Sequence, residues 1–329
     1  MWYFFLPIFL LFGLAIILYL KSDPFFDFSS SKKFRWVYSY QRLNDISTKN
    51  LLSTKINYNS FILGSSRSCG VYGCYLETKI PDSKFFHFAD WVENIGGVLA
   101  KLQFLDSQGY QLKNIIIYLD TDKTFEGEGS LTTEDHYEVT KQSKVAYKFA
   151  HFVSFFSFFN LEKFKILTGK GEESGYYVNQ PLDTLTNDYN HICSADVIKN
   201  YGFAQNDEVF RNKIDSLKSS GFLYSRPVIV AYNKPQISVE EEERIKKIIE
   251  VLKKHNSNYY IVITPLFDQR KFNSEDLKIL KKYFGKRLFD FSGKNSITEN
   301  IYNYPDRLHF QNYISKQIID SVLNDQRNK

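Results

Sequence analysis

Short runs of β-forming residues alternate with amphipathic helical segments along most of this 329-residue sequence. The runs are rich in Ile, Val, Phe and Tyr, which is typical of strands buried on both faces. They cover residues 60–64, 84–89, 114–119, 227–232, 259–264 and 287–291. Strands that alternate with helices predict a mostly parallel sheet covered by helices on both faces. The expected fold class is therefore α/β, a three-layer α/β/α sandwich.

One helix is predicted with particularly clear end signals, from Ser238 to His255. Ser238 and Glu241 have the spacing of a capping box, in which each side chain satisfies a backbone amide of the other residue. The acidic start and the basic end of the segment complement the helix dipole. Apolar residues recur on one face, as expected of a helix that covers a sheet: Ile245, Ile248, Ile249 and Leu252.

The alternation stops between Asp120 and Arg226, where about a hundred residues precede the next strong apolar run, far more than an ordinary connection needs. We expect a largely helical insertion at about residues 121–226. It includes the Phe-rich stretch 150–159, which is expected to fill the core of the insertion. Lining a substrate cleft or touching a membrane are the alternatives.

The N-terminus is apolar and uncharged from Trp2 to Leu20, where Lys21 ends the run. A helix of about 19 residues, at ~1.5 Å per residue, spans the ~30 Å hydrocarbon layer of a bilayer. The sequence therefore predicts a transmembrane anchor over residues 1–21, a linker or strap over 22–57 and an α/β domain over 58–329. A cleaved signal peptide is the alternative, but the run lacks a basic leader and an A-x-A site.

The side of the membrane on which the domain lies is ambiguous from the residues alone. The nearby basic residues all follow the apolar run, and the positive-inside tendency would keep the domain cytoplasmic. Local pairing of Cys69 with Cys74, which would leave Cys193 over, is one interpretation, but three buried thiols are the favoured one.

Composition excludes several broad classes of protein. Hydrophobic residues make up 43% and charged residues 24% of the chain, so it is neither wholly disordered nor a multi-spanning membrane protein. A net charge of +5 without a basic stripe argues against a nucleic-acid partner. The histidines and cysteines lack metal-ligand spacing, and no motif indicates a cofactor.

A serine-rich turn, Gly64-Ser65-Ser66-Arg67, follows the first predicted strand. Ligands of open parallel sheets bind beyond the carboxyl ends of the strands, where a tight turn would hold a nucleophilic hydroxyl clear of the backbone. The same residues are equally typical of a helix N-cap. Arg67 is expected to be a solvated charge or an ion-pair partner, and guidance of an anionic polymer is the alternative.

A second candidate lies near the end of the chain, where Asp306 and His309 precede a final amphipathic helix over about residues 312–323. Asp-x-x-His places both side chains on one turn. The carboxylate would orient the imidazole, and the other ring nitrogen would take a proton from a serine. His309 is the only histidine for which the sequence suggests a carboxylate partner in a late loop.

Together the two segments resemble the SGNH (GDSL-like) hydrolase superfamily, in which a serine follows the first strand and Asp-x-x-His follows the last. The resemblance implies a flavodoxin-like sheet and nominates Ser66 as nucleophile, His309 as general base and Asp306 as its orienter. It also implies an oxyanion hole built from the backbone amides of Ser66 and of Gly96 or Gly97, of which Gly97 is preferred.

One block departs from the family pattern. The sequence Asp120-Thr121-Asp122 follows the third strand, where the family has Gly-x-Asn-Asp. An ionised Asp accepts hydrogen bonds and repels an oxyanion, so it cannot replace the missing amide donor. Loss of one such donor costs ~3 kcal/mol of transition-state stabilisation. The hole is expected to be partial unless Thr121 or the insertion supplies a donor.

The resemblance is greatest to divergent, membrane-anchored members associated with cell-envelope polymers, such as the D-alanine transfer protein of teichoic acid synthesis and the alginate acetyltransferases. It implies a single-pass membrane protein with an extracytoplasmic domain, acting as a serine esterase or O-acyltransferase on an acylated glycan or related envelope polymer. One alternative is a catalytically weak or inactive domain that binds or organises envelope polysaccharide. Another is an anchored domain whose partner is a second membrane protein.

Overall fold

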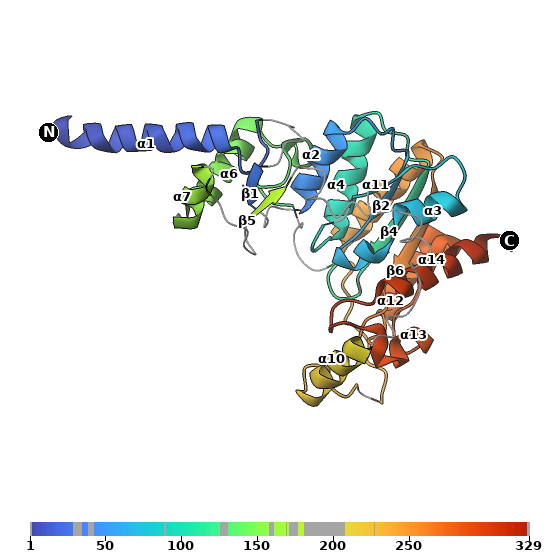
Figure 1. Ribbon diagram of the computed structural model, residues 1–329. Coiled ribbons are helices and arrows are strands. Elements are labelled where there is room, and N and C mark those ends of the chain that lie inside the picture. The colour runs from blue at the N-terminus through green and yellow to red at the C-terminus, as the bar shows by residue number, and fades with distance from the viewer. Residues whose placement is uncertain are drawn as a thin grey trace. The chain divides into compact units, whose positions relative to one another are not determined.

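The chain divides into two compact units, each built from two separate stretches of sequence. The first unit comprises residues 1–55 and 131–187, and the second comprises residues 56–130 and 188–329. The computed structural model in Figure 1 describes residues 2–28, 35–38, 43–88, 90–125, 131–157, 161–168, 170, 177–180, 208–226 and 228–327. The units are described separately below.

A five-stranded parallel sheet forms the centre of the second unit. Its strands are β2 (Ser60–Leu63), β3 (Phe85–His87), β4 (Asn114–Leu119), β6 (Asn258–Ile263) and β7 (Leu288–Asp290). They lie in the order β3-β2-β4-β6-β7, and each neighbouring pair is parallel. Counted along the chain this order is 2-1-3-4-5, a doubly wound order whose direction reverses between β2 and β4.

Helices lie between the strands and after the last strand in the sequence. They are η1 (Ser66–Gly70), α3 (Gly73–Lys79), α4 (Ile95–Ser107), α10 (Glu208–Ser219), α11 (Val239–Lys254), α12 (Ser274–Phe284), η2 (Gly285–Arg287), α13 (Ser296–Glu299), η3 (Ile301–Asn303) and α14 (Asn312–Arg327). The capping box predicted at the start of α11 is confirmed, because Ser238 and Glu241 bond reciprocally.

Both faces of the sheet are covered by helices, since alternate strand residues point in opposite directions. On one face Ile116, Tyr118 and Val262 form a buried cluster with residues of α3 and α14, including Leu76 and Ile318. The residues between them face the other way, toward the side where α4 and α11 pack together (Figure 1). The chain is α/β, as predicted, and its arrangement is consistent with three layers.

The strand predicted over residues 227–232 is wrong. Val228 and Ile229 are 87% and 83% exposed, and an isolated bridge between Tyr232 and Lys271 is the pairing found among the described residues of this run. β-Branched side chains favour an extended backbone, but a strand also needs a neighbouring strand along its length. Among the described residues this run makes the single bridge and no strand pairing, so it does not extend the sheet.

The first unit contains the N-terminal helix and most of the expected insertion. Its elements are α1 (Trp2–Ser22), β1 (Arg35–Tyr38), α2 (Leu43–Ser53), α5 (Tyr137–Thr140), α6 (Lys144–Ser157), α7 (Leu161–Leu167) and β5 (Tyr177–Gln180). Strands β1 and β5 pair antiparallel, so residues on either side of the first three strands of the main sheet come together here.

Two predictions fall on this unit. The segment 22–57 is not simply a linker, because it contains α2, in which Ile46 and Leu51 are buried. The Phe-rich stretch lies largely in α6, and Phe155 packs in a buried cluster with Tyr19 and Phe25. That part of the stretch fills a core, as expected.

Helix α1 covers the uncharged N-terminal stretch. Within the part of the chain that the structure describes, no helix has the combined length and apolar character needed to cross a bilayer.

Candidate active site

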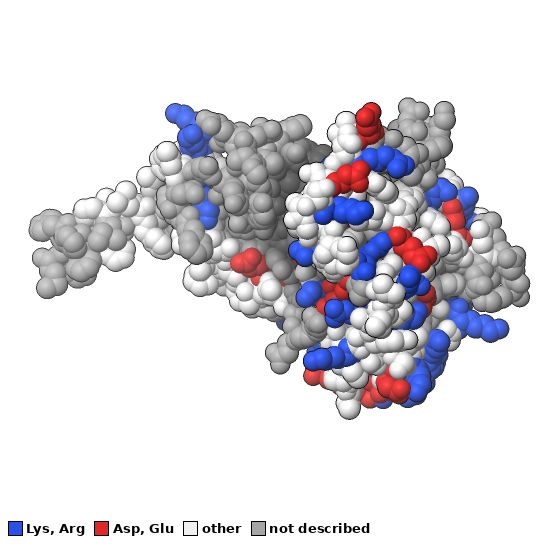
Figure 2. All heavy atoms as spheres, turned by 90° about the horizontal axis from the view of Figure 1, so that it is seen from below, with Lys and Arg blue, Asp and Glu red and all other residues white. Residues whose placement is uncertain are grey.

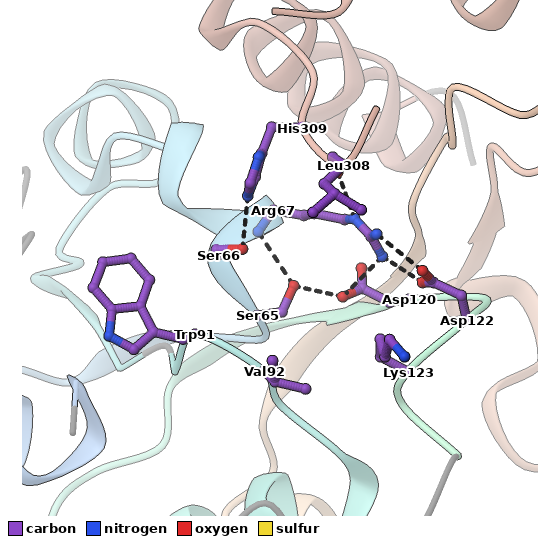
Figure 3. A pocket seen from close by; sticks show the side chains of 10 residues that line it. All are labelled: Ser65, Ser66, Arg67, Trp91, Val92, Asp120, Asp122, Lys123, Leu308 and His309. Carbon is purple, nitrogen blue, oxygen red and sulfur yellow. Dashed lines mark hydrogen bonds and ion pairs between the residues drawn. The ribbon is translucent and has the colours of Figure 1, made fainter. Parts of the chain in front are cut away.

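A pocket of about 130 Å³ opens at the carboxyl ends of β2, β3 and β4 in the second unit, at the point where the strand order reverses (Figure 3). Ligands of doubly wound sheets bind at this point. The residues that line the pocket come from four segments of the chain: Ser65, Ser66, Arg67, Trp91, Val92, Asp120, Asp122, Lys123, Leu308 and His309.

The three residues nominated as a triad lie together at this pocket. Ser66 Oγ lies 2.9 Å from His309 Nε2 (Figure 3). His309 Nδ1 lies 3.1 and 3.0 Å from the two carboxylate oxygens of Asp306. A serine, an imidazole and a carboxylate joined in this order form the hydrogen-bonded chain of a nucleophilic serine site.

The carboxylate of Asp306 fixes both the loop and the imidazole tautomer. Its Oδ1 accepts hydrogen bonds from the backbone amides of Leu308 and His309, at 2.6 and 2.8 Å. Burial raises the pKa of Asp306, but the hydrogen bonds from the His309 side chain and from these amides lower it further, so that its net pKa is below the ordinary value. The ionised carboxylate needs a proton on Nδ1, which leaves Nε2 of a neutral His309 to accept the Ser66 hydroxyl proton.

The backbone before Ser66 is restricted by Gly64, whose φ is +149°. A Cβ atom at this position would lie 2.7 Å from the Tyr118 Cβ atom, so the turn passes too close to β4 for a larger residue. Ser65 then caps η1, since its Oγ accepts from the Arg67 amide at 3.2 Å. The N-cap interpretation of this turn is therefore confirmed for Ser65, and Ser66 lines the pocket.

Ser68 and His87 form a second serine–histidine contact, in which the histidine is the hydrogen-bond donor. Ser68 Oγ donates to the Ser65 carbonyl at 2.7 Å and lies 2.9 Å from His87 Nε2. Because a hydroxyl has one proton, His87 Nε2 must carry the proton of the second bond. Burial, followed by the nearby Lys101 charge, lowers the pKa of His87 to about 3. His87 is therefore a neutral donor that supports the turn rather than a base.

Other histidines also have carboxylate partners, which the sequence did not suggest. His151 lies 2.8 Å from Asp27 Oδ2, and His255 lies 2.8 Å from Asp106 Oδ1. Within the described part of the chain, neither of these two histidines bonds to a serine hydroxyl. His309 therefore differs from His151 and His255 by its serine partner and from His87 by its carboxylate partner.

The segment Asp120-Thr121-Asp122, which follows β4, binds the side chain of Arg67. Arg67, 7% exposed, donates from Nη1 and Nη2 to the Asp122 carboxylate at 2.5 and 3.1 Å, and its Nη1 lies 3.3 Å from Asp120 Oδ2. Burial raises the pKa of Asp122, but the Arg67 hydrogen bonds and charge lower it to a net value below the ordinary one. Arg67 is therefore an ion-pair partner, as expected, and not a solvated charge.

The expected oxyanion donors are not both available. Gly97 does not line the pocket, and its amide donates to Asn94 Oδ1 at 2.9 Å, because Asn94 caps α4. The assignment of Gly97 is therefore wrong, since a capped amide at a helix start has no free donor. The Ser66 amide is at the pocket, where it makes a long 3.4 Å bond to the Trp91 carbonyl. Thr121 is buried and does not line the pocket.

The cysteines differ from the expected three thiols. Cys69 is free, whereas Cys74 is disulfide-bonded. Cys74 therefore does not pair with Cys69, and its partner lies outside the described residues. Among those residues, no group of three or more His, Cys, Asp or Glu side chains has the arrangement of a metal site.

Charges are mixed over the surface of the second unit. Figure 2 shows Lys and Arg side chains interspersed with Asp and Glu over the described part of the visible face. The rim of the pocket is instead apolar on three sides, since Trp91, Val92 and Leu308 are about half exposed. Exposed apolar groups beside a polar centre are typical of a small-molecule binding site.

Comparison with known proteins gives no family for this chain: no protein-family model matches the sequence, and no curated protein matches it.

Proposed function

We propose that this chain is a serine esterase or O-acyltransferase of the SGNH type, with Ser66 as nucleophile, His309 as general base and Asp306 as the orienter of His309. The observation that carries the proposal is the hydrogen-bonded chain from Ser66 Oγ through both His309 nitrogens to Asp306, at 2.9 and 3.0 Å. It lies at the reversal point of the sheet, on a pocket that opens to solvent.

The proposed reaction has two halves. Ser66 Oγ attacks the acyl carbonyl while His309 Nε2 takes its proton, and Asp306 stabilises the resulting imidazolium. His309 then returns the proton to the leaving alcohol as the ester C–O bond breaks, which leaves an acyl group on Ser66. Water or an acceptor hydroxyl then attacks the acyl carbonyl and gives its proton to His309. His309 returns this proton to Ser66 Oγ as the acyl–Ser66 bond breaks, so that hydrolysis and transfer share one site.

The topology supports membership of the superfamily. Ser66 follows the first strand of the sheet in chain order, and His309 follows the last strand, β7. The strand order 2-1-3-4-5 is the flavodoxin-like order that the resemblance implies. In that arrangement the segments that carry Ser66 and His309 meet at the carboxyl ends of the strands, although they come from opposite ends of the domain's sequence.

The size of the pocket favours a short acyl group. Its volume of about 130 Å³ is slightly below the ~150 Å³ of an engineered cavity that accommodates benzene. An acetyl or similarly small acyl group fits this space. We propose a short acyl ester of a glycan or related envelope polymer as the substrate, the polymer being what the family resemblance implies.

A fluorophosphonate probe and p-nitrophenyl acetate test this function on the full-length protein. We expect the probe to label Ser66, and both labelling and hydrolysis to be lost in Ser66→Ala and His309→Ala. Ser68→Ala is the matched control, because Ser68 also touches a histidine but is buried with the opposite hydrogen-bond polarity. Labelling that persists in Ser66→Ala contradicts the assignment.

A catalytically weak or inactive domain that binds envelope polysaccharide is the second candidate. It is favoured by the oxyanion side of the pocket, where the Trp91 carbonyl accepts from the Ser66 amide and Gly97 is unavailable. A substrate oxyanion would have to displace this carbonyl. Each missing donor lowers the rate about 10²- to 10³-fold, so a folded protein that binds acylated glycans without turnover would favour this candidate.

We also propose that α1 anchors the protein in a membrane with the second unit outside the cytoplasm. The uncharged residues 2–20 of α1 and the outward-facing Leu10, Phe12 and Ile17 support the anchor. The disulfide at Cys74 supports an oxidising compartment, because cytoplasmic thiols stay reduced. Removal of residues 1–21 is expected to move the protein from the membrane to the soluble fraction, and a soluble full-length protein would contradict the anchor.

A further inference from the structure

Arg67 is buried beside the proposed nucleophile, yet its guanidinium is directed at acceptors of the protein itself. Besides its bonds to Asp120 and Asp122, Arg67 Nε donates to the Leu308 carbonyl at 2.7 Å. These acceptors lie after β4 and in the loop before α14, whereas Arg67 belongs to η1 (Figure 3). A single side chain therefore joins three segments that are far apart in the sequence.

The contact with Leu308 acts on the peptide unit that precedes His309. Arg67 holds the carbonyl oxygen of this peptide, while Asp306 accepts from its amide, which belongs to His309, at 2.8 Å. Because a peptide unit is planar, fixing both its carbonyl and its amide fixes its plane. The Cα atom of His309, and with it the start of the imidazole side chain, is then held from both sides.

The planar fork of arginine suits this arrangement. One edge of the guanidinium meets the two oxygens of Asp122, and the Nε–H group remains for a third acceptor. A lysine has a single nitrogen and cannot reproduce this fork. Asp120 is oriented further by Ser65 and Thr264, whose hydroxyls donate to it at 2.5 and 2.9 Å.

We propose that Arg67 is a positioning residue that sets His309 against Ser66, and that the carboxylates after β4 hold this arginine. This inference rests on the proposed function. It gives the departure from the Gly-x-Asn-Asp pattern a role, because Asp120 and Asp122 orient the general base through Arg67 in place of donating to an oxyanion. The turn that carries the nucleophile thereby also fixes the loop that carries the base.

Steady-state hydrolysis of p-nitrophenyl acetate by the full-length protein tests the proposal through separate kcat and KM values. We expect Arg67→Met to lower kcat about 100-fold or more, with KM changed less than about threefold, since a misplaced base slows the chemical step. Arg67→Lys is expected to restore part of kcat, because it keeps the charge beside Asp120 and Asp122 but loses the fork.

Because Arg67 is buried, Asp122→Asn provides a gentler second variant. It leaves Arg67, Ser66 and His309 in place and weakens one side of the fork, so kcat is expected to fall about 3- to 10-fold, again with little change in KM. Arg287→Met is the matched control, since Arg287 bonds to Asn258 and the Tyr259 carbonyl at the amino ends of the strands. Its kcat is expected to match the unmodified protein.

The outcomes separate this proposal from the proposed function. If the unmodified protein neither hydrolyses the ester nor is labelled at Ser66, the proposed function fails, and the positioning role fails with it. If the unmodified protein is active and folded Arg67→Met and Asp122→Asn retain its kcat, the positioning proposal alone is overturned. A loss confined to KM also overturns it, because Arg67 would then act on substrate binding.

Discussion

The imidazole Nε2 of His309 lies 2.9 Å from the hydroxyl oxygen of Ser66, although 243 positions separate the two residues in the sequence. His309 follows β7, the last strand of the sheet in chain order, and Ser66 follows β2, the first. Because the strands are parallel, both residues lie at the carboxyl ends of the strands. There Asp306 bonds to His309 Nδ1, which leaves Nε2 to accept a proton from Ser66.

Replacement of Asp306 tests the role of the carboxylate. Asp306→Asn removes the charge that keeps the proton on Nδ1 and stabilises the imidazolium, so we expect kcat/KM to fall roughly 10²- to 10⁴-fold. Ester hydrolysis by the purified variant measures the change, with thermal unfolding as a check on the fold. Asp320→Asn is the control, because Asp320 pairs with Lys316 on α14. Equal rates for Asp306→Asn and the unmodified protein would remove Asp306 from the mechanism.

Replacement of Gly64 tests the close approach of the turn to β4. Gly64→Ala places a Cβ atom 2.7 Å from the Tyr118 Cβ atom at a backbone angle of +149°, so we expect a loss of ~2–4 kcal/mol in the free energy of unfolding. Gly109→Ala is the control, because Gly109 also has a positive φ but no atom lies within 4 Å of its added Cβ. Urea titration gives both values, and a similar small loss in the two variants would refute the steric argument.

The buried His87 predicts a specific acid sensitivity. Its pKa is lowered from 6.5 to about 3, so between these values the unfolded chain binds a proton that the folded protein does not. Stability is therefore expected to fall as the pH falls from about 6.5 to 3, by ~1.4 kcal/mol per pH unit for this one proton.

His87→Gln provides the comparison, because the glutamine amide can still donate to Ser68 but does not titrate. The difference in unfolding free energy between the two proteins, measured by urea titration from pH 7 to pH 4, should shrink as the pH falls. A difference that stays constant with pH would show that His87 does not carry this linkage.

The thiols give a chemical test of the covalent structure. Burial raises the pKa of the Cys69 thiol to about 12, so iodoacetamide is expected to leave the folded protein unmodified at pH 8. In denaturant without reductant, the unmodified protein should expose a thiol at Cys69, and Cys69→Ala should expose none. Mass spectrometry of the alkylated peptides measures this, and alkylation of Cys74 without reductant would contradict the disulfide.

Local residue patterns were sufficient to predict most of the sheet and the best-defined helix. The runs at 60–64, 114–119 and 259–264 coincide with β2, β4 and β6 to within a residue, because buried parallel strands require continuous β-branched and aromatic side chains. The same rule failed at Val228 and Ile229. Strand propensity is a local property, whereas pairing depends on a neighbour that only the fold supplies.

The sequence by itself determined the residue types for the chemistry: a serine on a glycine turn and an Asp-x-x-His segment. Tertiary structure decided how they are used. It gave His151 and His255 carboxylate partners far along the chain and buried Arg67 between two chain segments. Hydrogen-bond partners of this kind come from residues tens to hundreds of positions apart, so only the folded backbone determines which donors and acceptors remain free at the pocket.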